Sequence, residues 1–242
     1  MENYYDDVYV SIADKEQRGA RLSAQLDFIK NLLNRYETEI EILDFCCGQG
    51  RHLHGLTGVG RRLTGIDNSD LLLSYANKIL CEDIKLISAD VREYRFPFEY
   101  DFIICMESSF NFNDTDALQV MTSLAEGLKA DGSILIHVFN PIYAMTHLPR
   151  KTWVDLDSAL VLETRDYDGT LLTIRQKRLR KINDNEYHSN DAVIKFHLRN
   201  LEDFESLASK VDLELVEAYG SFDGTAPQAN QPELICILRH KE

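Results

Sequence analysis

The stretch ILDFCCGQGRH at residues 42–52 decides the fold of this chain, and it permits two interpretations. Two cysteines followed by a histidine could form a metal or redox site. Alternatively, Gly48 and Gly50 could belong to a ligand-binding loop in which Cys46 takes the place of a further glycine. Adjacent cysteines are poorly placed to bind one metal together, and the sequence contains no C-x-x-C pair. We therefore favour the loop, with Cys47 in the core and Cys46 at a pocket, and expect no metal site.

Short apolar strands and amphipathic helices alternate around this loop as far as residue 140. Strands are predicted at residues 40–47, 61–67, 84–90, 100–106 and 133–140. Helices are predicted at residues 15–36, 71–80 and 116–132, and Ser69 or Asp70 is the expected N-cap of the second. Such alternation is typical of a doubly wound parallel sheet, so the fold class is α/β.

The pattern changes after Pro141. Residues 153–198 contain three β-rich stretches separated by the turn signals YDGT and NDNE, which predicts an antiparallel meander. A helix at residues 201–211, with Asn200 as its N-cap, precedes two strands at residues 213–219 and 234–240. These strands are close enough to form an antiparallel hairpin, which ordinary dinucleotide-binding sheets lack.

Composition limits the class of partner. The 242 residues carry a formal charge of −14, which would repel a phosphate backbone, so we expect no nucleic-acid partner. No apolar run approaches the ~18 residues of a membrane span, and the acidic start does not resemble a signal peptide. Five cysteines, an odd number, fit reduced thiols. We expect a cytoplasmic protein without membrane contact, either a monomer or a homodimer.

The loop and the residues that follow it favour one type of ligand. Gly48 and Gly50 let a ligand approach the backbone, and Asp67 ends the next strand where a carboxylate can accept hydrogen bonds from ribose hydroxyls. Leu53 occupies the place of the third glycine of a nicotinamide-dinucleotide loop. Asp44 precedes the loop, where a carboxylate would repel a pyrophosphate but attract an ammonium group. S-adenosylmethionine carries such an ammonium, and Asp90 could accept from its adenine amino group.

These motifs together resemble the class I S-adenosylmethionine-dependent methyltransferases over about residues 5–140, and the terminal hairpin fits as well. Cys46 departs from the glycine that the family usually has. The resemblance implies a Rossmann-like methyltransferase fold, with a seven-stranded, mostly parallel sheet and S-adenosyl-L-methionine as cofactor. It implies cofactor contacts from nine residues: Asp44, Cys46, Gly48, Gly50, Asp67, Asn68, Asp90, Val91 and Met106.

A subgroup resemblance concerns the substrate. CMESSFNFND at residues 105–114 and YGSFDGTAP at residues 219–227 resemble small-molecule N-methyltransferases of the amino-sugar type. Departures at Glu107 and Asn111 lie where the substrate should sit. The resemblance implies one domain, residues 1–242, divided into an N-terminal lid helix at 1–37, a cofactor-binding core at 38–140, a substrate-covering insert at 150–198 and a C-terminal helix and hairpin at 199–242.

Several side chains keep two interpretations. Glu107 could be a solvated acid or a catalytic carboxylate that takes a proton from an amine. Tyr5 and Tyr9 could be core aromatics or lid residues, and Tyr9 is our second catalytic candidate. Phe110 and His197, the latter where the subgroup often has arginine, are expected substrate contacts. The basic run at residues 173–181 could be a solvated edge strand or a cradle for an anionic substrate.

The expected function is N-methylation of a small amine-bearing metabolite by in-line displacement. The acceptor could instead be a peptide N-terminus, a hydroxyl or a carboxyl. Two remoter alternatives are a binding protein that does not turn over S-adenosylmethionine and an NAD(P)-dependent Rossmann enzyme.

Overall fold

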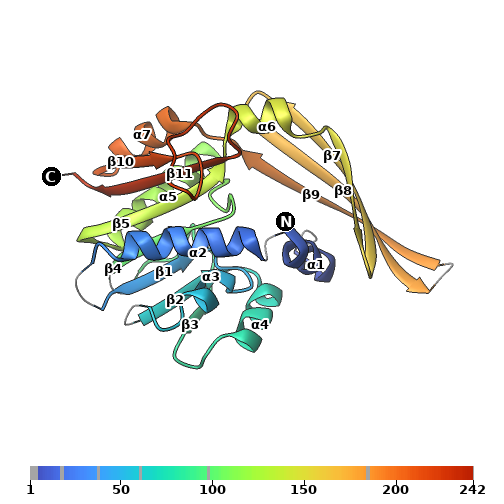
Figure 1. Ribbon diagram of the computed structural model, residues 1–242, viewed down its shortest axis with the longest axis horizontal. Coiled ribbons are helices and arrows are strands. Elements are labelled where there is room, and N and C mark those ends of the chain that lie inside the picture. The colour runs from blue at the N-terminus through green and yellow to red at the C-terminus, as the bar shows by residue number, and fades with distance from the viewer. Residues whose placement is uncertain are drawn as a thin grey trace.

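The computed structural model of this chain describes residues 5–16, 19–36, 39–59, 62–96, 99–183 and 186–241. Two β-sheets form its framework (Figure 1). The larger sheet contains, in spatial order, β10 (Leu213–Tyr219), β11 (Glu233–His240), β5 (Leu128–Phe139), β4 (Tyr100–Cys105), β1 (Glu41–Phe45), β2 (Arg62–Asp67) and β3 (Lys85–Ser88). The smaller sheet contains β6 (Lys151–Leu156), β7 (Ala159–Asp168), β8 (Leu171–Asn183) and β9 (Glu186–His197).

The large sheet has the predicted mixture of strand directions. Strands β1 to β5 run parallel, whereas β11 is antiparallel to both β5 and β10. The spatial order reverses between β1 and β4, so the loops that follow these strands open on one crevice, where doubly wound sheets bind ligands. The predicted fold class, including the terminal hairpin, is confirmed.

Helices cover both faces of this sheet (Figure 1). They are α2 (Ala20–Leu33), α3 (Arg51–Gly55) and α4 (Asp70–Ile79) on one face, and α5 (Asp114–Glu126) and α7 (Leu201–Ser209) on the other. Alternate residues of β4 serve the two cores, because Phe102 packs with α2 while Ile103 packs with α5. The capping residues follow the sequence rules: Ser69 caps α4 and Asn200 caps α7.

The first helix, α1 (Asp7–Glu16), lies between the large sheet and the long strands of the insert (Figure 1). Val8 and Ile12 pack against Leu156 and Val161 of the small sheet. The Tyr75 hydroxyl of α4 donates a hydrogen bond to Asp7 at 3.1 Å. The helix therefore joins the two parts of the molecule.

Two expectations about secondary structure are wrong, and one helix was not predicted. The predicted helix at residues 15–36 is represented by the end of α1 and by α2, which begins only at Ala20, with residues 17–18 outside the described part. The predicted helix at residues 116–132 ends at Glu126, because Leu128 already pairs with Tyr100 as the start of β5. Residues 141–147, for which no element was predicted, form α6 (Pro141–His147), which has Asn140 as its N-cap.

The insert also differs from its prediction. It has four strands, because a turn at residues 157–158 separates β6 from β7. The basic run lies on β8, which pairs with β7 and β9 and is therefore an inner strand. The Arg178 side chain is completely buried. The edge-strand interpretation is wrong.

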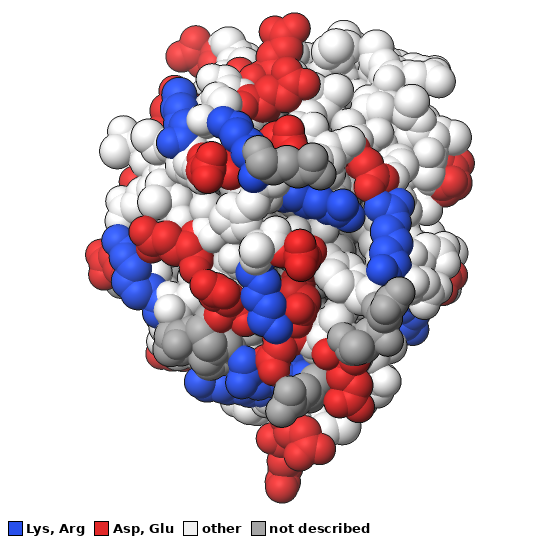
Figure 2. Space-filling view, turned by 90° about the vertical axis from the view of Figure 1, so that its left-hand side faces the viewer, with Lys and Arg blue, Asp and Glu red and all other residues white. Residues whose placement is uncertain are grey.

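Charged side chains of both signs are interspersed on the face seen in Figure 2. Among the described residues of that face, Lys and Arg form no continuous basic surface. Within the described part of the chain, no helix is long and apolar enough to span a membrane.

Candidate functional site

The loop after β1 has an unusual backbone. Cys46, Gly48 and Gly50 have φ values of 64°, 53° and 73°, in the left-handed region that glycine adopts most readily. The Gly48 amide donates to the Asp67 carboxylate at 2.9 Å, and the second oxygen of Asp67 accepts from the Ser69 amide at 2.9 Å. Asp67 therefore joins the first loop to the start of α4.

A cavity of about 450 Å³ lies beside this loop. Its walls come from α1, from the loops after β1, β2, β3 and β4, and from β9 of the insert. The lining residues are Tyr5, Tyr9, Cys46, Gly48, Asp67, Asn68, Leu72, Ala89, Asp90, Val91, Arg92, Ser109, Asn111, Phe112, Asn113, Asp116, Val193, Ile194, Lys195 and His197. The cavity thus unites the predicted cofactor loop with the predicted lid and insert.

Asp44 lies beneath the loop, at the end of β1, with 1% of its surface exposed. Its Oδ2 atom has no hydrogen-bond partner among the described residues. Burial raises the pKa of Asp44 to about 8, and the nearby carboxylate of Asp67 adds to the effect, while Arg51 opposes it. A buried carboxyl oxygen without a partner is costly, so this position is suited to a cationic group of a ligand.

The other two predicted acids, Asp67 and Asp90, line the cavity, and their pKa values shift in opposite directions. Burial raises the pKa of Asp67, although its hydrogen bonds from the Ser69 and Gly48 amides oppose the rise. Asp90 is paired with Arg92, whose Nε atom lies 2.9 Å from one carboxylate oxygen and 3.1 Å from the other. This contact lowers the pKa of Asp90.

Asp44, which lies beneath the loop, and three further predicted contacts do not line the cavity. Met106 is buried in the core beneath α2, and Phe110 is buried between Phe112 and Phe204. The two predictions failed because the chain after β4 directs both side chains into the core. Gly50 is the N-cap of α3, where an added Cβ would lie 2.9 Å from Leu80, so its role is to allow close packing.

Glu107 does not line the cavity either. Its two carboxylate oxygens accept from Arg21 at 3.3 Å each, and one of them also accepts from Gln25. Burial alone would raise the pKa of Glu107, but its neighbours His137, Arg21 and Gln25 together lower it. A carboxylate that is already paired and weakly basic is a poor proton acceptor. This pairing argues against the expectation that Glu107 deprotonates an amine.

Tyr5, Tyr9 and His197 contribute to the cavity wall, and His197 does so from β9 of the insert. The two tyrosine rings meet edge to face, with centroids 4.9 Å apart, and both line the cavity. Burial raises the pKa of Tyr9. Partial burial and the Arg199 charge lower the pKa of His197, which keeps the ring neutral near pH 7.

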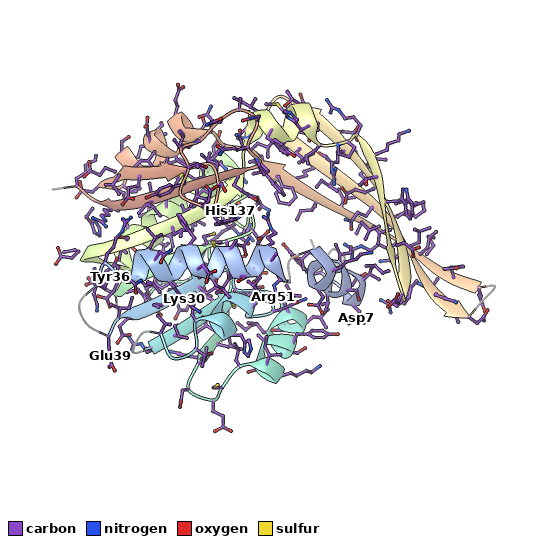
Figure 3. All side chains as sticks on the ribbon, viewed as in Figure 1. Asp7, Lys30, Tyr36, Glu39, Arg51 and His137 are labelled. Carbon is purple, nitrogen blue, oxygen red and sulfur yellow. The ribbon has the colours of Figure 1, made fainter. Side chains whose placement is uncertain are left out.

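Four important side chains escaped the sequence reasoning: Arg21, Arg51, His137 and Glu233. Arg51 follows the loop directly and could have been noticed as the only basic side chain between Gly48 and His52. Its charge acts on Asp44 and Tyr9, and Figure 3 shows it on the side of the molecule that carries Asp7. The other three carried no local signal, because their partners are distant in sequence.

Metal chemistry finds no support in the described ranges, where no cluster of three or more His, Cys, Asp or Glu side chains could hold a metal ion. Cys47 is buried in the core and Cys46 lines the cavity. The cysteine pair therefore belongs to the loop and its packing.

Comparison with known proteins agrees with this geometry. The methyltransferase domain family matches residues 42–132. The putative methyltransferase YqeM of Bacillus subtilis (strain 168) is 25% identical over 80% of this chain and 81% of that protein. The dTDP-3-amino-3,4,6-trideoxy-alpha-D-glucopyranose N,N-dimethyltransferase of Streptomyces venezuelae is 29% identical over 49% of this chain and 51% of that protein, so the match spans about half of that relative.

Among solved structures, an S-adenosylmethionine-dependent methyltransferase from Clostridium acetobutylicum ATCC 824 has a TM-score of 0.84 at 18% identity. The match covers 98% of this chain and 99% of that one. Residues 42–132 thus resemble the methyltransferase domain family in sequence, and the whole chain shares the fold of the Clostridium acetobutylicum structure. The resemblance to the S-adenosylmethionine-dependent methyltransferases is confirmed.

Proposed function

We propose that this protein transfers a methyl group from S-adenosylmethionine to the amine nitrogen of a small metabolite. The observation that carries the proposal is the buried Oδ2 atom of Asp44, which lacks a partner beneath the loop of a methyltransferase domain. A ligand ammonium at this point would satisfy that atom and hold the carboxylate in its charged form.

The residues around the cavity fit the other parts of this cofactor. Asp67 would accept hydrogen bonds from the ribose hydroxyls, since its carboxylate lines the cavity at the end of β2. Asp90 and Val91 border the place expected for adenine, with Arg92 holding the Asp90 carboxylate in one orientation. When bound, S-adenosylmethionine supplies an activated methyl group on a sulfonium sulfur.

The protein must also handle the proton of the acceptor amine, because only a neutral amine is nucleophilic. We assign this task to His197, whose ring lines the cavity and has a lowered pKa. Histidine that is neutral near pH 7 can accept a proton directly from a bound ammonium. Tyr9 on α1 and Tyr5 just before this helix would close the cavity and exclude water.

An amine acceptor is preferred to oxygen acceptors for two reasons. The Streptomyces venezuelae relative is named for N,N-dimethyl transfer to an amino sugar. The cavity lining also contains more acidic than basic side chains, Asp67, Asp90 and Asp116 against Arg92 and Lys195, and this balance favours a cationic ligand over an anionic one. The lining amides of Asn111 and Asn113 would suit hydroxyl groups on the same acceptor.

Calorimetry with S-adenosylhomocysteine tests the cofactor assignment. The wild-type protein should bind this compound and should not bind NAD or NADP. Asp67→Ala should abolish binding, whereas Asp83→Ala, at an exposed acid outside the cavity, should leave it unchanged. Binding of NAD instead of S-adenosylhomocysteine would refute the proposal.

A second assay tests the acceptor. Small amines, peptides with free N-termini and hydroxyl or carboxyl compounds are incubated with S-adenosylmethionine, and each product is analysed by mass spectrometry for an added methyl group. Methylation confined to amino-sugar-like or other small amines supports the proposal. Methylation only on oxygen, or only on peptide N-termini, would overturn the choice of acceptor while keeping the cofactor.

A further inference from the structure

The turn after β4 adopts a conformation that needs support. Glu107 and Ser108 have φ values of 56° and 58°, so two consecutive residues with side chains lie in the left-handed region. Such residues persist only when surrounding contacts hold them, and they gather at functional sites. The turn leads directly to Ser109 and Asn111, which line the cavity.

Strand β5 supplies the contacts that hold this turn. The Glu107 amide donates to His137 Nδ1 at 3.1 Å, and the Ser108 amide donates to the His137 carbonyl at 3.0 Å. The Phe139 amide donates to the Ser108 hydroxyl at 2.9 Å. One histidine therefore binds both left-handed residues, through its ring and through its backbone.

The His137 ring is fixed from its other side. Its Nε2 atom lies 2.5 Å from a carboxylate oxygen of Glu233 on β11, and the histidine is completely buried. Because Nδ1 accepts a hydrogen bond, Nε2 carries the ring proton and donates it to Glu233. Figure 3 shows the position of His137 relative to α2.

Arg21 on α2 completes a closed circuit. Its guanidinium donates to the other oxygen of Glu233 at 2.6 Å and to both oxygens of Glu107 at 3.3 Å. The circuit runs from Glu107 through His137, Glu233 and Arg21 back to Glu107. Every carboxylate in it has a cationic or N–H partner, as buried charges require.

We infer that Glu107, His137, Glu233 and Arg21 form a positioning unit that fixes the cavity wall after β4. Its function for the cofactor site rests on the proposed function. Glu107 is then a positioning residue that acts through the turn, and His137 is the member that determines the backbone conformation. Since Arg21 lies in the first turn of α2, docking of this helix and shaping of the cavity wall are linked.

Two substitutions of His137 separate its contacts. In His137→Asn, the side-chain oxygen replaces the Nδ1 acceptor and keeps the bond to the Glu107 amide. In His137→Gln, the amide nitrogen of the longer side chain takes the place of Nε2 and keeps the hydrogen bond to Glu233. The bond that the Glu107 amide donates to the ring is lost. Amide hydrogen exchange of a peptide covering residues 105–112 reports on the turn, and calorimetry with S-adenosylhomocysteine reports on the site.

The expected results differ between the two variants. His137→Gln should speed exchange in this peptide by about tenfold. It should also weaken the binding of S-adenosylhomocysteine by about fivefold, a change in affinity that corresponds to one lost hydrogen bond. His137→Asn should restore both measurements to within about twofold of wild type. Equal exchange in wild type and His137→Gln, or equal damage in both variants, would overturn the inference.

Arg21→Gln provides a second route should His137→Gln fail to fold, because Arg21 is partly exposed on α2. It should also speed exchange at residues 105–112. Arg35→Gln is the matched control, since Arg35 follows the same helix and pairs with Glu217 away from the turn. If wild type fails to bind S-adenosylhomocysteine, the proposed function fails, yet the exchange measurements still decide whether the unit holds the turn.

Discussion

The guanidinium of Arg178, which has no exposed surface, lies 2.5 Å from a carboxylate oxygen of Asp6 at the start of α1. Asn190 donates to the other oxygen of Asp6 at 3.2 Å, and Gln176 accepts two further hydrogen bonds from Arg178. The most buried charge of the basic run is thus used to hold the first helix. The remaining interpretation of that run, a cradle for an anionic substrate, finds no free guanidinium at this position.

Asp6→Asn should loosen α1 because it removes the charge opposite a buried guanidinium. The expected loss in the free energy of unfolding is about 2 kcal/mol, measured by urea denaturation. Asp166→Asn is the control, because Asp166 and Arg175 form an exposed pair and should contribute less than about 1 kcal/mol. Similar losses in the two variants would show that the Asp6 contact has no special weight.

Binding of S-adenosylhomocysteine should release a proton at pH 7. Asp44 has a pKa of about 8 and is therefore about nine-tenths protonated at pH 7, whereas a bound ammonium requires its charged form. The affinity should rise as the pH increases toward about 8 and then level off. Calorimetry in buffers of different ionisation enthalpy measures the released proton, and Asp44→Asn should bind weakly and release none from this group.

His197→Gln should slow methylation of the acceptor that the screen identifies and leave the affinity for S-adenosylhomocysteine unchanged. The wild-type rate should fall as the pH decreases through the pKa of His197, which lies below its ordinary value of 6.5, because the protonated ring cannot accept a proton. The variant should lose this inflection. His188→Gln, on the exposed far part of β9, is the control. An unchanged pH profile in His197→Gln would exclude the assigned role.

Acid should destabilise the protein through His52. Burial lowers the pKa of this ring to about 4, and its Nε2 atom lies 3.0 Å from the Gln25 side-chain oxygen. Above pH 6.5 the ring is neutral in both states, so the full stability is present. Between pH 6.5 and about 4 the unfolded chain takes up the proton first, and roughly 2–3 kcal/mol is lost.

Chemical denaturation at several pH values measures that loss. His52→Gln should flatten the dependence between pH 6.5 and 4, while the exposed His54→Gln should follow the wild-type curve. A wild-type curve that stays level across this range would contradict the assignment.

The cofactor loop could be predicted from the sequence because the residues that form it are close together along the chain. Gly48 and Asp67 are separated by 19 residues and lie at the ends of adjacent strands, so the order of strands alone brings them together. The circuit around Glu107 was beyond reach for the opposite reason. Arg21 is 86 residues from Glu107 and 212 from Glu233. Only tertiary packing joins such groups, and without their partners Glu107 resembled a free base.

The predicted boundaries of helices and strands were wrong where tertiary contacts outweighed the local helix or strand preference of the sequence. Residues 127–132 continue a helical pattern, yet the pairing of Leu128 with Tyr100 makes them the start of a strand. The fourth strand of the insert was missed because the turn at residues 157–158 contains neither glycine nor proline. Short polar turns of this kind give little warning in a sequence.

The position of α1 has a consequence for kinetics. Asp7 at the start of the helix binds Tyr75 of α4, and Asp6 just before it binds Arg178 of the insert. Tyr5 and Tyr9 from the same segment form part of the cavity wall. Reactants and products that pass this wall would enter and leave the cavity through the same opening. Binding and release would then follow a compulsory order, and the rate at which this segment moves aside would set an upper limit on the rate of turnover.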